Sequence, residues 1–181
     1  MNGCNIKYLS ENTIYARKSV GQKCIFLSHQ KNDAAVCKHI ADYLMKSGVD
    51  VYFDEYDNDL KIYRQENRPK GVVDSIKKGI QNSTHMLCVV SPNTLFSKWV
   101  PWEVGYGYDK LSLSVLTLKG IKDEQLTEYL QTVPIIRGTK SLNEYLSNIA
   151  GEYKTKMFST NRLIIESASS HPLDNYLDWN L

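Results

Sequence analysis

The chain has 181 residues, of which 42% are apolar and 23% are charged. These values fit one globular domain with short additions at its ends, able to build a core without disulfides or metal. The net charge is only +2 and the Lys and Arg residues are scattered, which argues against nucleic acid as a partner. No apolar run approaches the ~20 residues that span a bilayer, and residues 1–21 lack the apolar core of a secretory signal. We therefore expect a soluble, cytoplasmic protein with no membrane partner.

The cysteines give no sign of a metal site. There are four of them, at Cys4, Cys24, Cys37 and Cys88. None forms a CxxC pair and their spacing matches no zinc pattern. Three of the four lie in apolar strand-like or helical runs, so we expect buried structural thiols, which suit a reducing cytosol.

The first half of the chain alternates short apolar runs with helical patterns. Residues 23–28 predict a buried strand, and residues 32–48 a helix of period 3.6 with Asp33 or the residue before it as N-cap. The β-branched and aromatic residues of 49–54 predict a second strand. Residues 55–70 are polar without a clean period, and we expect a long loop that can fold over a site as a lid.

The second half continues the alternation. Pro101 fits only in the first turn of a helix, so one helix begins near Trp99 or Val100. Pro134 favours an edge position for the last strand. The other predicted helices cover residues 71–83, 122–131 and 141–158, and the other predicted strands cover residues 85–91, 113–118 and 133–138.

Five strands alternating with helices imply a parallel sheet covered on both faces. With right-handed crossovers, the favoured solution is a flavodoxin-like, three-layer α/β fold with strand order 2-1-3-4-5. We assign residues 23–158 to this domain and residues 1–22 to an N-terminal extension. Residues 159–181 form a C-terminal tail that we expect to pack on the domain or on a partner.

The strand order predicts where a ligand would bind. In such sheets the site lies at the carboxyl ends of the strands where the order reverses, here between strands one and three. Strand one delivers Ser28 and His29 to this point, and the helix after strand three carries Trp99 and Glu103. Strand two ends nearby at Asp54. Topology alone therefore predicts Ser28, His29, Trp99 and Glu103 near one crevice, with Asp54 next to it.

Several familiar sites are absent. No GxGxxG follows the first strand, and there is no GxxxxGK[ST] phosphate loop. A response-regulator receiver would need an acidic pair after strand one and an Asp ending strand three, where this chain has Ser28-His29 and Ser91-Pro92. Nothing nearby completes a triad with Ser28 and His29, which disfavours serine-hydrolase chemistry.

The segment SKWVPWEVGYGY, residues 97–108, sets one acid, Glu103, in the most aromatic part of the chain. From spacing alone, two interpretations stay open. Glu103 is either an ordinary acid in a first helical turn, stabilised by the helix dipole, or a single carboxylate that does chemistry. Trp99 stands one turn before it, and Tyr106 continues the same face.

Together these pieces resemble a TIR domain. The resemblance covers most of the chain, and the WxxxE spacing of Trp99 and Glu103 is fairly specific in that context. The segments that carry it are CIFLSHQKND, GVDVYFDE, HMLCVVSPNTLFSKWVPWEVGYG and VPIIRG.

The resemblance implies one of two functions. Some TIR domains cleave NAD⁺, with the glutamate of the WxxxE-type helix as the catalytic residue, and others are adaptors that signal by self-association. This chain resembles the bacterial stand-alone enzymes, such as the TIR subunit of the Thoeris anti-phage system. Those make cyclic or modified ADP-ribose messengers that switch on a separate effector protein. NAD⁺ would then be the substrate, and no cofactor is implied.

The resemblance also implies roles for the remaining site residues. Glu103 would be catalytic. Phe26, Ser28 and His29 would line the nicotinamide and ribose end, and Asp54 would sit at the base of the lid. An aromatic wall would be formed by Trp99 and Tyr106. Three of these residues also have a simpler interpretation. Phe26 could be a core residue of the strand, Asp54 could cap a loop, and Trp99 could pack the helix onto the sheet.

Two positions depart from the family pattern. Pro101 and Trp102 fill places where the family often has a small residue or Cys, and this change could alter the angle of the helix. His29 replaces the commoner Tyr, which could alter what stacks on the substrate.

The chemistry of NAD⁺ explains how one carboxylate could suffice. Ordinary glycoside hydrolysis uses two carboxylates, one of which protonates the leaving oxygen. Nicotinamide leaves as a neutral molecule and needs no acid. One anion can stabilise the oxocarbenium-like ribose that remains, while aromatic side chains stack on flat rings and exclude water.

Overall fold

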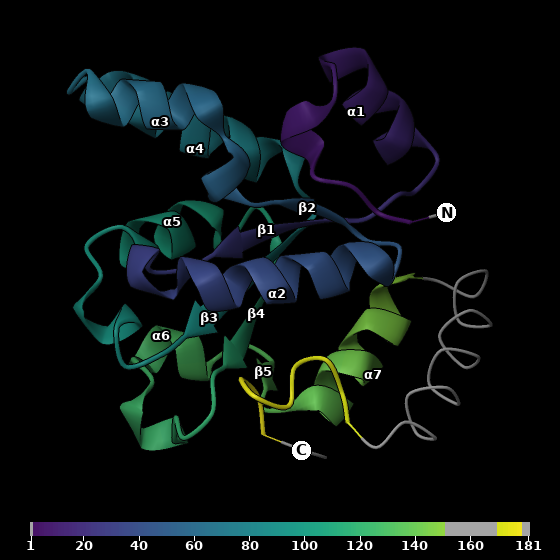
Figure 1. Cartoon of the computed structure of the whole chain (residues 1–181), viewed down its shortest axis with the longest axis vertical. Coiled ribbons are helices and arrows are strands. Elements are labelled where there is room, and N and C mark those ends of the chain that lie inside the picture. Colours follow the sequence, from purple (N-terminus) through teal and green to yellow (C-terminus); the bar gives the residue numbers. More distant parts are fainter. Residues whose placement is uncertain (1, 151–169, 179–181) are drawn as a thin grey trace.

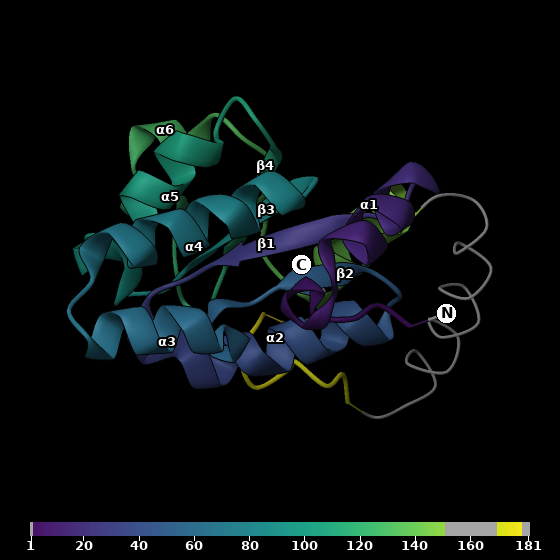
Figure 2. The same ribbon diagram turned by 90° about the horizontal axis from the view of Figure 1, so that it is seen from above.

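The computed structural model describes residues 2–150 and 170–178. Its centre is an all-parallel sheet of five strands in the order β2-β1-β3-β4-β5, which confirms the predicted flavodoxin-like topology. Helices cover both faces (Figures 1 and 2). The strands are β1 (Cys24–Ser28), β2 (Asp50–Tyr52), β3 (His85–Val90), β4 (Ser112–Thr117) and β5 (Ile135–Ile136).

One face of the sheet packs against α2 (Ala34–Lys46) and α7 (Thr139–Ala150). The other face packs against α4 (Pro69–Asn82), α5 (Val100–Gly107) and the short α6 (Glu128–Gln131). Figure 2 shows α2 on one side of the sheet and α4, α5 and α6 on the other. The alternation along β1 explains the two cores: Ile25 and Leu27 belong to the first, and Cys24 and Phe26 to the second.

The segment predicted as a long loop after β2 is helical, so that prediction was wrong. A 3₁₀ turn at Asp54–Tyr56 leads into α3 (Asn58–Gln65). The side chain of Asp57 caps α3 by accepting a hydrogen bond from Leu60 N. Leu60 is fully buried, and this one apolar anchor is too little to establish a helical period in so short a segment.

One helix is shorter than predicted, and another is described only in part. The segment 122–131 divides into a 3₁₀ turn (Asp123–Gln125) and α6. The helix predicted over 141–158 is α7, described as far as Ala150, and residues 151–158 lie outside the described part of the chain. Among the described residues, no helix is long and apolar enough to cross a membrane.

The N-terminal segment lies against the edge of the sheet beside β2 (Figure 1). Asn5 forms a parallel bridge with Val51, and α1 (Glu11–Ser19) follows. Arg17 on α1 holds the buried carboxylate of Asp50 with two hydrogen bonds of 2.7 and 2.6 Å. This bidentate pair fastens the segment to β2.

The described part of the C-terminal tail, residues 170–178, packs on the α2 and α7 side of the sheet. Leu173 and Leu177 are buried in that core. Asp178 forms a bridge with Gly138, and Tyr176 O accepts a hydrogen bond from Lys119 N. The residues that follow, 179–181, lie outside the described part of the chain.

Candidate active site

The predicted switch point brings Ser28 and Glu103 into direct contact. Ser28 is the last residue of β1, and its Cα pairs with Cys88 on β3. Glu103 stands in the first turn of α5, the helix that follows β3. Ser28 Oγ donates a 2.7 Å hydrogen bond to Glu103 Oε2. Both side chains are buried, with 1% of Ser28 and 6% of Glu103 exposed, so Glu103 is not an ordinary solvated acid.

The surroundings of Glu103 bring the pKa of its carboxyl close to neutral pH. Burial raises its pKa to about 7, and the negative charge of Asp54 also raises it. The Ser28 hydrogen bond and the positive charge of Arg64 act in the opposite direction. A buried carboxyl that ionises near physiological pH is characteristic of functional sites, although structural networks also produce such shifts.

His29 and Asp54 meet beside this pair. His29 Nδ1 lies 3.1 Å from Leu27 O, and its Nε2 lies 3.5 Å from Asp54 Oδ1. The imidazole packs on Phe53 with ring centroids 5.0 Å apart. Arg64, on α3, approaches Asp54 Oδ2 at 3.3 Å. Asp54 therefore lies where the sequence predicted it, at the base of the segment after β2, but that segment is a helix.

Phe26 lies two residues before Ser28 on β1, in the core between the sheet and α5. It is 2% exposed and stacks on Tyr52, with centroids 5.3 Å apart and planes 9° from parallel. This placement matches the simpler alternative, a core residue of β1. A direct contact between Phe26 and a substrate remains a prediction that this packing does not favour.

Trp99 and Tyr106 belong to one aromatic row along α5, and Trp102 joins them. Trp102 meets Trp99 edge-on at 5.7 Å and stacks on Tyr106 at 5.7 Å. Trp99 is 40% exposed. The ring of Tyr106 lies under Lys110 Nζ, 4.1 Å away. The aromatic row lies next to Glu103 on α5, because residues three and four apart are neighbours on a helix.

The family comparison agrees with the fold. The model that describes the TIR domain matches residues 25–144, well over half of the chain, from β1 into α7. The chain belongs to the TIR domain family.

A curated relative of this TIR domain is named "Probable 3' cyclic ADP-D-ribose synthase ThsB'" and comes from Bacillus cereus (strain MSX-D12). The two proteins are 29% identical over an alignment of 121 residues that covers 64% of this chain. The alignment spans 61% of the relative, less than two thirds of its length.

The sequence analysis did not predict a second group of polar contacts at the switch point of this TIR domain. Asp33 is buried, and its carboxylate accepts hydrogen bonds from Ser91 Oγ at 2.5 Å and from Asn93 Nδ2 at 2.6 Å. These bonds tie the loop after β1 to the loop after β3. The sequence carries a signal for this contact, because both loops bring short polar side chains to the same edge of the sheet.

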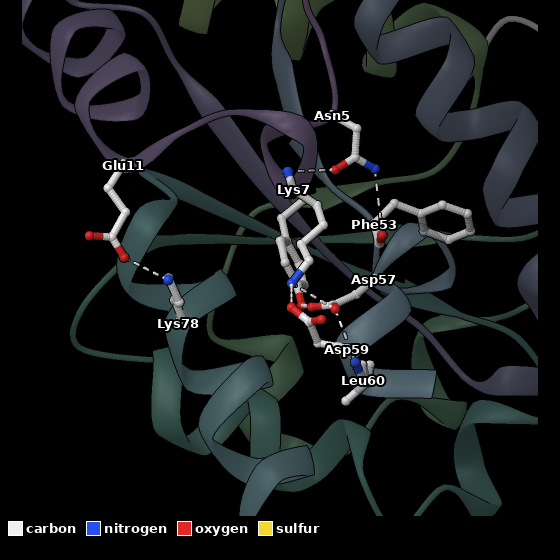
Figure 3. A network of polar contacts seen from close by, with 9 residues as sticks. Asn5, Lys7, Glu11, Phe53, Asp57, Asp59, Leu60 and Lys78 are labelled. Carbon is white, nitrogen blue, oxygen red and sulfur yellow. Dashed lines mark hydrogen bonds and ion pairs between the residues drawn. The ribbon is translucent and has the colours of Figure 1, made fainter. Parts of the chain in front are cut away.

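A cavity of about 680 Å³ lies elsewhere in the TIR domain, between the N-terminal segment, α3 and α4. Its walls include neither Glu103 nor Ser28. Figure 3 shows the ion pairs along it: Lys7 lies 2.8 Å from both Asp57 and Asp59, and Lys78 lies 2.6 Å from Glu11. The cavity therefore lies apart from the Ser28–Glu103 pair, and we assign it no part in the chemistry.

Proposed function

We propose that this TIR domain cleaves NAD⁺, releases nicotinamide and makes a cyclic or otherwise modified ADP-ribose signal. The observation that carries the proposal is the buried Ser28–Glu103 pair at the switch point of the sheet. The relative named as a 3′ cyclic ADP-D-ribose synthase supports the same reaction class. An antiviral role rests on the resemblance to Thoeris TIR subunits.

The reaction needs one anion at the ribose. The bond between ribose C1′ and the nicotinamide nitrogen breaks, the bonding electrons leave with nicotinamide, and positive charge develops on the ribose. Glu103 in its ionised form stabilises that charge. Because the pKa of Glu103 is about 7, the carboxyl is easily converted to this form near neutral pH, and the cationic nicotinamide ring favours the ionised state further.

The fate of the ribose depends on which nucleophile reaches C1′. Water would give linear ADP-ribose, and a nucleophile within the same molecule would give a cyclic product. Glu103 is only 6% exposed, so the site is largely closed to bulk water, which favours the internal nucleophile. The same burial means that residues over Glu103 must move to admit NAD⁺.

The cellular setting belongs to the proposal. A diffusible nucleotide product would reach a separate effector protein, and assembly of several TIR domains would provide a means of opening the site. The cysteines Cys4, Cys24, Cys37 and Cys88 are free, as expected for a protein that works in the reducing cytoplasm.

The alternative is a non-enzymatic module that signals through TIR–TIR contacts. One observation favours it: Leu95, Phe96 and Trp99, beside the site, are 43%, 85% and 40% exposed. Exposed apolar side chains gathered in one place often mark protein interfaces. An adaptor would consume no NAD⁺ at any protein concentration.

The deciding experiment is incubation of the purified chain with NAD⁺ at high protein concentration, followed by mass spectrometry of the products. We expect nicotinamide and one ADP-ribose isomer from the wild type, and a loss of turnover of at least about 100-fold in Glu103→Gln. Glu128→Gln is the matched control, because Glu128 is an exposed acid in the first turn of α6. Unchanged turnover in Glu103→Gln would exclude the catalytic role. No product from a folded wild type, with or without crowding agents, would favour the adaptor.

A further inference from the structure

His29, Asp54 and Glu55 form a group of possible metal ligands beside the Ser28–Glu103 pair. One ligand atom from each of them lies within 4.8 Å of the other two. The sequence predicts His29 and Asp54 near one crevice, but it does not indicate that Glu55 joins them, because Glu55 lies in the segment that was predicted to be a loop. An imidazole with two carboxylates is a donor set that suits a divalent transition ion.

The tautomer of His29 leaves its Nε2 available to a cation. Nδ1 lies 3.1 Å from Leu27 O, and a carbonyl oxygen can only accept, so Nδ1 carries the proton of this bond. In the neutral ring, Nε2 then presents a lone pair. A metal-binding histidine is typically held in this way, with its other nitrogen bonded to a backbone carbonyl or a carboxylate.

The atom that faces Nε2 is also an acceptor. Asp54 Oδ1 lies 3.5 Å from His29 Nε2. This oxygen is buried and has no hydrogen-bond partner in the described part of the chain. The side chain of His29 itself is only 3% exposed. Two acceptors that face each other out of water are unfavourable unless a cation or a proton lies between them.

The spacing fits a metal ion. Zinc binds His nitrogen and carboxylate oxygen at roughly 2.0–2.2 Å, so two ligands at a tetrahedral angle lie about 3.4 Å apart. The separation of 3.5 Å between Nε2 and Oδ1 is close to this value. The second oxygen of Asp54 lies 3.3 Å from Arg64 Nη2, a contact that orients the carboxylate as the outer partners of metal ligands do.

We infer that His29 Nε2, Asp54 Oδ1 and the carboxylate of Glu55 bind one divalent transition ion of the Zn²⁺ type beside the Ser28–Glu103 pair. Glu55 is half-buried, and one of its carboxylate oxygens lies within 4.8 Å of the other two ligand atoms, so we expect a change of its rotamer to bring it to the ion. Three protein ligands leave a fourth position open to an oxygen of water or of a bound molecule. An all-oxygen ion such as Ca²⁺ is disfavoured by the imidazole.

The site does not depend on NAD⁺ cleavage, so it is tested by metal binding alone. The full-length, reduced and chelator-treated chain is titrated with Co²⁺, which reports its ligands by visible absorption. We expect one Co²⁺ per chain and no near-ultraviolet charge-transfer band of a thiolate. Calorimetric titration with Zn²⁺ should give the same stoichiometry.

The variants decide which side chains hold the ion. His29→Gln and Glu55→Gln should each weaken binding by at least about tenfold, since losing even an outer partner of a ligand costs roughly 10–100-fold. The matched controls are His39→Gln and Glu66→Gln, at an exposed histidine and an exposed glutamate outside the group. Both should bind as the wild type does.

Three outcomes would overturn the inference. They are the absence of binding, a thiolate band that assigns the ion to cysteine, and binding that Glu55→Gln leaves unchanged. Because Glu55 is partly exposed, this variant remains informative if His29→Gln fails to fold, and its melting temperature verifies that it is folded. The first outcome would assign the His29–Asp54 contact to an ordinary ion pair.

Discussion

Ser28 Oγ donates a 2.7 Å hydrogen bond to Glu103 Oε2 and so joins two residues that lie 75 positions apart in the chain. The bond connects the end of β1 to the first turn of α5 across the switch point. It has an electrostatic consequence, because a donor to the carboxylate stabilises the ionised form and lowers the pKa of Glu103 against the effect of burial.

Ser28→Ala should therefore raise the pKa of Glu103. A hydrogen bond to a charged group contributes about 1.5–3 kcal/mol, so the pH of half-maximal NAD⁺ turnover should rise by roughly 1 to 2. Turnover should fall near pH 7 and recover at higher pH. A ¹³C NMR titration of the Glu103 carboxyl measures the same change without relying on activity. Ser112→Ala, at an exposed serine of β4, is the control and should change neither the pH dependence of turnover nor the NMR titration. If Ser28→Ala also left both unchanged, Ser28 would not be setting the pKa of Glu103.

Glu103 should lower the stability of the fold above neutral pH. Its pKa is about 7 in the folded protein against an ordinary value of 4.5, so the folded state binds the proton more tightly than the unfolded state. As pH rises through this interval, the folded state loses stability by an amount on the order of 3 kcal/mol. Glu103→Gln carries no charge and can still accept the Ser28 hydrogen bond.

We therefore expect Glu103→Gln to be more stable than the wild type at pH 8, and the difference to shrink at pH 5. Urea unfolding at the two pH values measures this change. Glu128→Gln should show no such pH-dependent gain. A Glu103→Gln variant that is equally destabilised at both pH values would mean that the carboxylate is needed for packing.

The sheet was predictable from the sequence because its signals are local. Each strand is a short apolar run between turn residues, and right-handed crossovers leave few possible orders. Helix α3 was missed because its support comes from elsewhere in the chain. Asp57, which caps α3, is held by Lys7 of the N-terminal segment, and no window around residue 60 contains that contact.

The site was partly predictable for the same reason. Strand order places the ends of β1 and β3 together, which is sufficient to bring Ser28 near Glu103. Which hydrogen bonds form at this edge depends on how closely the side chains approach one another in three dimensions. Asp33 was a candidate N-cap of α2, yet its side chain makes no cap bond and instead binds Ser91 across the switch point. Trp102 was treated only as a departure from the family, but it is the central ring of the aromatic row.

The Lys7–Asp57 ion pair should stabilise α3. Asp57 is buried, with 1% of its side chain exposed, and Lys7 is 25% exposed. Burial opposes ionisation of Asp57, but the hydrogen bonds from Lys7, Leu60 N and the Tyr52 hydroxyl outweigh it and hold its pKa below the usual range. Lys7→Met removes one of these donors and leaves the others, so we expect a loss of about 1–3 kcal/mol at pH 7.

The same variant should be more sensitive to acid. Asp57 contributes stability above its ordinary pKa, and this contribution is lost as pH falls through its folded pKa. Without Lys7 that pKa is higher, so the loss begins at a higher pH. Hydrogen exchange of α3 amides should quicken as well. Lys78→Met removes the exposed pair with Glu11 along the same cavity (Figure 3) and should change neither property measurably. Equal effects of the two substitutions would contradict the special position of Asp57.

Gly79 should not tolerate a side chain, although it lies in the middle of α4. A Cβ at Gly79 would lie 2.5 Å from the ring of Tyr52. That ring cannot easily yield, because its hydroxyl donates a 2.7 Å hydrogen bond to Asp57 and its face stacks on the ring of Phe26. Overpacking of this kind costs about 1–3 kcal/mol, and it outweighs the gain of up to about 1 kcal/mol from replacing Gly by Ala in a helix.

Gly105→Ala is the matched control, since a Cβ at that position of α5 meets nothing within 4 Å. The two substitutions should therefore change the free energy of unfolding in opposite directions, with Gly105→Ala stabilising and Gly79→Ala destabilising. Urea unfolding of both variants measures the difference. If Gly79→Ala proved as stable as Gly105→Ala, the Tyr52 ring would be free to move, and its hydrogen bond could not hold Asp57, and through it α3, in a fixed position.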